Sequence, residues 1–437
     1  MSDVNSGPRS DPISMVEFRV GDGEDLSRAV YHLQWESFVN RGYTIKVVVL
    51  DPNYNLLKST VNGSGGDVNQ IKYLKEGRKK IVTVRFKLKK GDQETEEQVA
   101  YLTDMQSTGV GVGARTIFIG IDPLSFLLSR GKSKGNYYDG SVSDVIKQVV
   151  TEYSSQPNGP GATVNVSKTE DNDKNRWFTY RQDPKTFIKS LLDWSSSVTK
   201  GKSRWIVSSG WDAENDRPKI NIKEEVELDR KQIGTYTIFT NDQNPRQFKD
   251  WFLSMNNFTS AFQTRMTTSG ISSVSGRYID QISLKDKSTV DDETTGSKLN
   301  VDYGNKELGA GSDKAFTKPD DVDWGTYVTA IPEQNDGGVG KNYEDYIDGR
   351  ARQKFMNLLG VSMNLMVDVI GEPRLFNSEQ LGAIWCVLKW MDADADFYFL
   401  HGKWLINGFQ HYYNRDDGWR TKIMLYRIDW NANATKI

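Results

Sequence analysis

The sequence predicts a β-rich α+β protein, in which two antiparallel β-barrel modules flank a middle region that contains helices and β-hairpins. Three observations lead to this class. Segments with alternating apolar and polar residues gather towards both ends of the chain, segments with helical periodicity fall between them, and turn residues separate the alternating segments. The chain has 437 residues, which is enough for roughly two to four domains with cores of their own.

The first β-barrel module is predicted over residues 14–130, after a flexible polar arm at residues 1–13. Its clearest strand signal is at residues 81–89, where apolar and polar residues alternate, and residues 43–50 and 117–121 repeat the pattern. Side chains alternate across a strand, so one face of each strand is expected in a core and the other in solvent. No helical segment separates these strands, which favours an antiparallel barrel or sandwich.

Two amphipathic helices are predicted in the middle region, residues 131–282. The first begins after Ser141, a plausible N-cap residue that has Asp144 three positions later, as in a capping box. The second begins at Asp183, with Pro184 at the first helical position. Their apolar stripes are expected to form buried faces.

A β-hairpin of residues 204–208 and 219–224 follows these helices in the prediction. Residues 283–340 are mostly polar, charged and glycine-containing, and they are predicted to form a long mobile excursion that a partner can order. The last region, residues 341–437, is predicted to open with a helix at 343–359 and to continue as the second β-barrel module. Its strands are expected at residues 363–369, 383–389, 397–400, 404–409 and 421–428.

Composition excludes several classes of protein. The 56 basic residues nearly balance the 58 acidic ones, which argues against a protein whose main work is to coat duplex DNA. The single cysteine, Cys386, lies in an apolar stretch and is expected to be a buried structural thiol. The N-terminal residues lack the features of a signal peptide, and no stretch approaches about 18 apolar residues, so no membrane insertion is expected.

No pattern in the sequence predicts a catalytic, cofactor-binding or metal site, so the protein is expected not to be an enzyme and to need no cofactor. The three histidines, His32, His401 and His411, fall in no metal-ligand motif and are expected at the surface or packed on strands. The glycine-rich run 109–113 is not a dinucleotide fingerprint, because a strand and not a helix is expected after it.

Two weaker signals lie near the C-terminal end. Three alternating aspartates resemble the start of a calcium loop, but Phe397 and Lys403 stand where the glycine and the glutamate should be, so a solvated hairpin tip is expected. These aspartates are Asp392, Asp394 and Asp396. Five tryptophans in the same region are expected to form an aromatic core or a subunit interface, although they could stack on sugars or bases. They are Trp385, Trp390, Trp404, Trp419 and Trp430.

Several segments, in a fixed order along the chain, resemble the hub module of contractile-tail baseplates. This module is shared by T-even-type phage baseplate hubs, phage late-control tail proteins and the spike proteins of type VI secretion. The matching segments are residues 138–146, 178–184, 186–194, 204–208, 371–374, 402–411 and 419–427. The excursion at 283–340 has no obvious counterpart in the family.

The resemblance implies a trimer in which each subunit contributes two tail-tube-like barrels, giving a ring of pseudo-six-fold symmetry. Such a ring would join a hexameric tail tube to a trimeric central spike, contact baseplate wedge proteins, and let DNA pass through its lumen without specific binding during genome ejection. The implied location is the tail baseplate of a virion, after synthesis and folding in the bacterial host cytoplasm. The family has no catalytic residue to carry over.

Two other hypotheses stay open at this point. The tryptophan-rich C-terminal region would suit a carbohydrate-binding or adhesion module of a tail. A cell-wall hydrolase has weaker support, which comes from scattered acidic residues such as Glu372 and Glu379.

Overall fold

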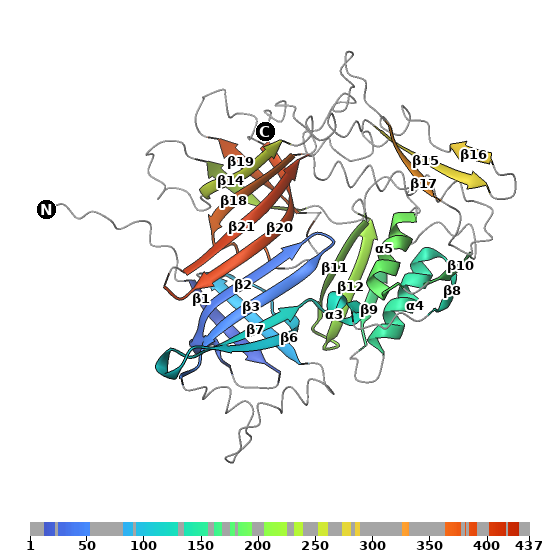
Figure 1. The fold of residues 1–437 in the computed structure, drawn as a ribbon. Helices are drawn as coiled ribbons and strands as arrows, with labels where there is room; N and C mark the ends of the chain where they lie inside the picture. The colour runs from blue at the N-terminus through green and yellow to red at the C-terminus, as the bar shows by residue number, and fades with distance from the viewer. Residues whose placement is uncertain are drawn as a thin grey trace.

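The fold is that of a computed structural model, and β-strands dominate it (Figure 1). Its helices gather in the middle region, so the predicted β-rich α+β class is confirmed. The residues that the structure describes are 13–21, 25–52, 82–90, 93–129, 135–155, 161–167, 175–179, 182–194, 205–224, 231–238, 252–260, 273–280, 285–288, 326–331, 363–376, 381, 384–390, 402–416 and 418–427.

Seven strands form the first part of a large sheet, which we call the N-terminal β-unit. They are β1 (Ile13–Val20), β2 (Val30–Phe38), β3 (Gly42–Leu50), β4 (Thr83–Lys90), the short β5 (Gln93–Glu94), β6 (Gln98–Thr108) and β7 (Arg115–Ile121). The order in the sheet is β1-β4-β6-β7-β3-β2, with β5 beside β4, and all pairings are antiparallel. The alternation predicted at 81–89 is confirmed on β4, where Val84, Phe86 and Leu88 are fully buried.

Six strands form the second part of the same sheet, the C-terminal β-unit. They are β13 (Lys231–Ile238), β14 (Phe252–Ser260), β18 (Met363–Ile370), β19 (Ile384–Trp390), β20 (Gly402–Asn414) and β21 (Gly418–Arg427). The order is β20-β21-β18-β14 on one side, with β19 beside β20 and β13 beside β19 on the other. All of its pairings are antiparallel except that of β13 with β19.

The two β-units are joined edge to edge through β20, which changes partner along its length (Figure 1). Residues 402–405 of β20 pair with β19, whereas residues 408–414 pair with β2. The change falls at Gly408, where the register of β20 against β21 also shifts. A Cβ on Gly408 would lie 2.6 Å from Cδ1 of Phe38 and 2.8 Å from the carbonyl oxygen of Ser37, so only glycine lets β2 approach.

One hydrophobic core runs through both β-units. It includes Trp35 and Phe86 from the N-terminal unit and Trp404, Phe409 and Leu365 from the C-terminal unit, all at most 2% exposed. The ring of Trp35 lies edge-on to both Phe86 and Phe409, with ring centroids 4.9 and 5.1 Å apart. Aromatic pairs in this geometry add about 0.5–1.5 kcal/mol beyond the burial of their area. The two units are therefore fastened by side-chain packing as well as by strand pairing.

The middle region has a core of its own, built from helices on a small sheet (Figure 1). Its helices are α3 (Pro123–Ser129), α4 (Val142–Ser154) and α5 (Pro184–Trp194). Its strands are β9 (Thr163–Val166), β11 (Trp205–Asp212) and β12 (Arg217–Glu224), in the order β11-β12-β9, and the separate pair β8 (Tyr137–Gly140) and β10 (Asn175–Phe178). The hairpin predicted at 204–208 and 219–224 is the β11–β12 pair.

Both predicted helix starts are confirmed. The Ser141 side chain accepts a hydrogen bond from the backbone N–H of Asp144 at 3.3 Å, which caps α4. The Asp183 carboxylate accepts from the backbone N–H and the hydroxyl of Thr186, at 2.9 and 2.6 Å, which caps α5. Each cap satisfies a backbone donor that has no partner inside the helix, and such a cap contributes about 1 kcal/mol.

One helix was not predicted, two strands lie within the predicted excursion, and several expected elements fall outside the described residues. The short helix α3 was not predicted, because its seven residues are too few to show a helical period. Two strands, β16 (Lys285–Ser288) and β17 (Thr326–Ile331), lie within the predicted excursion 283–340 and pair with β15 (Ser273–Asp280). The expected helix 343–359 and strand 397–400 lie outside the described residues, as do residues 1–12 of the expected arm. The predicted domain boundaries remain predictions.

No helix within the described ranges has the length and apolar character that a membrane crossing requires.

Replacing Gly408 with alanine is expected to lower the free energy of unfolding by about 1–3 kcal/mol, because the new methyl group would force β2 away from β20. The matched control is Gly113→Ala, since a Cβ at Gly113 meets nothing within 4 Å. Urea unfolding followed by tryptophan fluorescence measures both changes. Equal stabilities for the two variants would contradict the role given to Gly408.

Candidate functional site

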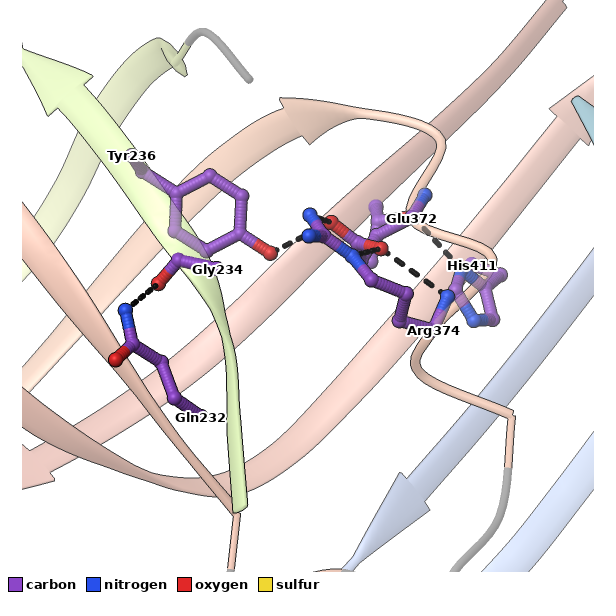
Figure 2. Close-up of polar contacts among 7 residues, drawn as sticks. Gln232, Gly234, Tyr236, Glu372, Arg374 and His411 are labelled. Atoms are coloured by element: carbon purple, nitrogen blue, oxygen red, sulfur yellow. Dashed lines mark hydrogen bonds and ion pairs between the residues drawn. The ribbon is translucent and has the colours of Figure 1, made fainter. Parts of the chain in front are cut away.

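A cluster of polar side chains, which we call the polar junction, lies in the C-terminal β-unit beside the shared hydrophobic core (Figure 2). It is built from separate parts of the chain, namely β13, the turn that follows β18, β20 and β21. Figure 2 shows Glu372 and Arg374 facing each other between Tyr236 on one side and His411 on the other. The members of the polar junction are Tyr236, Glu372, Arg374, His411, Trp419 and Thr421.

Glu372 is the acidic centre of the polar junction, and its side chain is only 3% exposed. One carboxylate oxygen accepts from Nε of Arg374 at 2.6 Å, and the other accepts from Nη2 of Arg374 at 2.6 Å and from the Tyr236 hydroxyl at 2.7 Å. Burial acts to raise the pKa of Glu372, but the hydrogen bonds and positive charge of Arg374 outweigh it and hold this pKa below its usual value. The carboxylate is therefore kept ionised inside the protein.

The surroundings of His411 fix its tautomer. Trp419 Nε1, which can only donate, lies 3.0 Å from His411 Nδ1, so Nδ1 must be an acceptor. The other ring nitrogen, Nε2, then carries the proton and donates to the carbonyl oxygen of Leu375. The Thr421 hydroxyl completes the arrangement, because it accepts from the backbone N–H of Glu372 at 2.9 Å and lies 2.8 Å from His411 Nδ1, whose single lone pair it shares with Trp419 Nε1.

The same histidine is part of the aromatic core. Its ring centroid lies 5.0 Å from that of Trp35 in β2, 4.8 Å from that of Phe409 and 5.1 Å from that of Trp419. Burial lowers the pKa of His411 to about 4, although the Leu375 carbonyl and the charge of Glu372 act in the opposite direction. His411 is thus neutral, and it connects the polar junction to the N-terminal β-unit through Trp35.

This geometry suits a structural role and does not suit hydrolysis. Glu372, one of the acids that made a hydrolase a hypothesis, is enclosed and already bonded to Arg374 and Tyr236, so it is not available to a substrate. Glu379 lies outside the described residues. Within the part of the chain that the structure describes, no cluster of three or more His, Cys, Asp and Glu side chains could hold a metal ion.

A second set of polar contacts fastens the middle region to the N-terminal β-unit. Asn40, in the turn between β2 and β3, donates from its side-chain amide to the Trp205 carbonyl at 2.9 Å and accepts from the Val207 N–H at 2.6 Å. The amide thus bonds the edge of β11 as a neighbouring strand would. Asn40 has a φ of 62°, a left-handed conformation that asparagine tolerates better than most residues.

Asp122 provides the next contact across this boundary. One of its oxygens accepts from the Ser209 hydroxyl of β11 at 2.8 Å and from the backbone N–H of Ser125 at 2.9 Å. Burial raises the pKa of Asp122, and the hydrogen bonds from Ser125 and Ser209 oppose that rise. Gly42 (φ 77°) leaves room for the carboxylate, since a Cβ there would lie 2.1 Å from an Asp122 oxygen.

An ion pair makes the third contact of this set. Arg85 of β4 bonds Asp216, in the turn between β11 and β12, at 2.7 Å, and Glu97 at 3.0 Å. Its guanidinium carbon also lies 5.4 Å from the ring centre of Trp211. Because Asp216 is 72% exposed, the ion pair itself contributes little, and the stacking of Arg85 on Trp211 adds to it.

The structure places the residues that the sequence singled out in different surroundings. Cys386 is fully buried, as expected of a structural thiol, and burial raises its pKa. Trp404 and Trp419 are also buried, which confirms an aromatic core for these two. His411 is packed on a strand as expected, and His32 is half-buried on β2. His401, the three aspartates of the calcium-like pattern and Trp430 lie outside the described residues.

The contacts of Asn40, Asp122 and Arg374 were not predicted. The hairpin turn at 40–42 was visible as Asn-Arg-Gly between two alternating segments, but its partner strand β11 lies some 165 positions away in the chain. Glu372 and Arg374 stand two residues apart within residues 371–374, one of the segments that resemble the tail-hub family, and nothing local indicated that Glu372 would be buried. Long-range packing decides these roles.

Comparison with known proteins gives a consistent result for the fold. No protein-family model matches the sequence, and no curated protein matches it. Among solved structures, the 43 kDa tail protein of prophage MuSo2 from Shewanella oneidensis aligns with a TM-score of 0.53 and 10% identity, over 97% of this chain and 99% of that one. The tail protein from Neisseria meningitidis MC58 aligns with a TM-score of 0.51 and 11% identity, over the same shares.

A further likeness is to a chain of the Francisella PdpA–VgrG complex in its half-lidded form, with a TM-score of 0.51 and 8% identity. That alignment covers 98% of this chain and 59% of the Francisella chain. At identities of 8–11%, these alignments show that the proteins share a fold. The chain therefore has the fold of these tail proteins, and the predicted resemblance to the tail-hub family is confirmed at that level.

The stability of the protein is expected to fall by about 3 kcal/mol as the pH drops from 6.5 to 4, because of His411. In that window the unfolded chain takes up a proton on this histidine and the folded chain does not, so acid favours unfolding. Urea unfolding at a series of pH values measures the slope. A His32→Gln control variant is expected to keep most of this dependence on pH. A free energy of unfolding that does not change between pH 6.5 and 5 would contradict the role given to His411.

Removing the arginine that neutralises the buried Glu372 carboxylate is expected to be costly. Arg374→Met should lower the free energy of unfolding by about 3 kcal/mol, because the Glu372 carboxylate stays buried without its partner. The double variant Glu372→Gln with Arg374→Met should recover part of that loss. The control is Arg19→Met, which breaks a partly exposed pair with Glu17 and should cost under about 1 kcal/mol. A double variant less stable than Arg374→Met alone would argue against a buried unpaired charge.

Proposed function

We propose that this protein is the structural hub of a phage tail baseplate. In this proposal three copies form a ring that joins the hexameric tail tube to the trimeric central spike and leaves a channel for genome ejection. One observation carries the proposal, namely that a single chain holds two β-units of six long strands each, joined side by side through β2 and β20 (Figure 1). The likeness in fold to solved tail proteins over nearly the whole chain supports the same role.

The symmetry argument is physical. A trimer of chains with two β-units each offers six similar surfaces, so it can face a six-fold tube on one side and a three-fold spike on the other. The shared core and the strand pairing at β20 support this reading, because they keep the two β-units of a chain in one fixed relation. A ring of this kind would meet baseplate wedge proteins at its outer surface.

The charge of the protein suits a channel for DNA. The formal net charge is −2, which is compatible with a lumen through which DNA passes without specific binding. The Glu372 carboxylate is buried and bonded by Arg374 and Tyr236, which supports a structural role over a catalytic one. In this proposal the protein works in the virion tail baseplate after synthesis in the cytoplasm of a bacterial host.

The carbohydrate-binding hypothesis loses part of its support, because two of the five tryptophans that suggested it are buried. Trp404 and Trp419 are both at most 1% exposed, so they are not available to stack on sugars. Of the two acids that suggested a cell-wall hydrolase, Glu372 is enclosed in the same way, and Glu379 lies outside the described residues.

The proposal predicts a trimer. Light scattering on the purified protein, alone and mixed with the central spike protein of the same tail, should give roughly three times the 49.6 kDa of one chain for the hub component. Class averages in the electron microscope should show a ring with a central hole and a six-lobed outline. A monomer under both conditions, without a channel, would overturn the proposal.

A further inference from the structure

A cavity of about 500 Å³ lies between the N-terminal β-unit and the middle region, beside the contacts of Asn40 and Asp122. Its size falls within the roughly 300–1,000 Å³ that is typical of ligand-binding pockets. The turn between β2 and β3, the start of α3, one face of α5 and the strand β11 form its walls. Most of the wall is apolar, with contributions from Leu124, Leu128, Ile188, Leu192 and Val207.

The polar groups in the wall are largely engaged with one another. Ser209 donates to Asp122, Asn40 is bonded to the backbone of β11, and Lys185 donates to the Ser125 hydroxyl at 3.1 Å. A small polar ligand is normally held by a few free, convergent hydrogen-bonding groups. Here the wall offers mainly shape and apolar surface, which is the kind of surface that receives an anchoring side chain of another protein.

The charges around the cavity have one dominant sign. Arg41, Lys185 and Lys189 line it and are exposed, and none of them forms an ion pair with another described residue. Asp122 is the only acidic residue among the described residues that line the cavity, and its hydrogen bonds hold it in the wall. An occupant with negative charge beside an apolar group would therefore complement both the walls and the charged side chains.

We propose that this cavity is a docking site for an acidic segment of a partner protein, whose aliphatic or aromatic side chain enters the cavity while its carboxylates meet Arg41, Lys185 and Lys189. This inference rests on the proposed role in assembly, since such a role requires partner proteins. An occupant here would touch the N-terminal β-unit and the middle region at once, so its binding would also fix how these two parts of the chain are held together.

Fluorescence polarisation with two labelled peptides tests the proposal on the full chain. One peptide carries a central leucine between aspartates, and in the other lysines replace the aspartates. The acidic peptide is expected to bind with a Kd on the order of 100 µM, to bind more weakly as salt is added, and to bind at least about tenfold more tightly than the basic one. Equal binding of both peptides, or none at about 1 mM, would overturn the proposal.

Variants locate the site. Lys189→Glu should weaken binding of the acidic peptide several-fold, and Lys185→Glu with Lys189→Glu should weaken it about tenfold or more. The matched control is Lys147→Glu on α4, an exposed helical lysine that does not line the cavity and should leave the Kd unchanged. Because these lysines are exposed, the variants are expected to fold, and circular dichroism checks this. An equal effect of all three changes would place the peptide elsewhere and overturn the site.

A cavity-filling variant and a small amphiphile complete the test. Val39→Trp should block the peptide without removing a charge, since Val39 lines the cavity and is half-buried. If sodium decanoate binds in a way that depends on Lys189 while neither peptide binds, the site takes a small anionic amphiphile, and the partner-protein proposal fails. All of these measurements use the isolated chain, so they can fail or succeed independently of trimer formation.

Discussion

The pairing of β20 with two different neighbours is the constraint on which the rest of the structure depends. Its first residues continue the sheet of the C-terminal β-unit through β19, and its last seven pair with β2 of the other unit. Hydrogen bonds of a strand must be satisfied along its whole length, so the two units cannot move apart without exposing this edge. Gly408, at the point of change, lets the two backbones come close enough to pair.

Burying the charge of the polar junction costs free energy, and only the native arrangement of the strands brings its charged groups together. A buried ion pair adds little net stability, but it strongly penalises any arrangement that separates its charges. Glu372 can meet Arg374 and Tyr236 together only when β13 and the turn after β18 are both in place. His411 then links that arrangement to Trp35 of the other unit. The junction therefore specifies how the strands come together, while apolar packing supplies most of the stability.

The attachment of the middle region follows a different principle. Among the described residues, side chains such as Asn40 and Asp122 make the contacts across this boundary that a paired strand would otherwise make. The boundary leaves an apolar cavity beside a set of basic side chains, whereas the β20 junction is closely packed. A rigid double β-unit with a more open contact at its side suits a protein that holds one surface fixed and offers another to partners.

The sequence by itself determined the local elements, because alternation, helical periodicity and capping residues act over a few positions. It therefore predicted β4, the starts of α4 and α5 and the β-rich class, and the order of its segments pointed to the tail-hub fold. The tertiary structure alone decided that both β-units share one sheet, that Glu372 is buried against Arg374, and that Asn40 bonds β11. These contacts join residues from distant parts of the chain or depend on burial, and no short-range pattern in a single sequence encodes either.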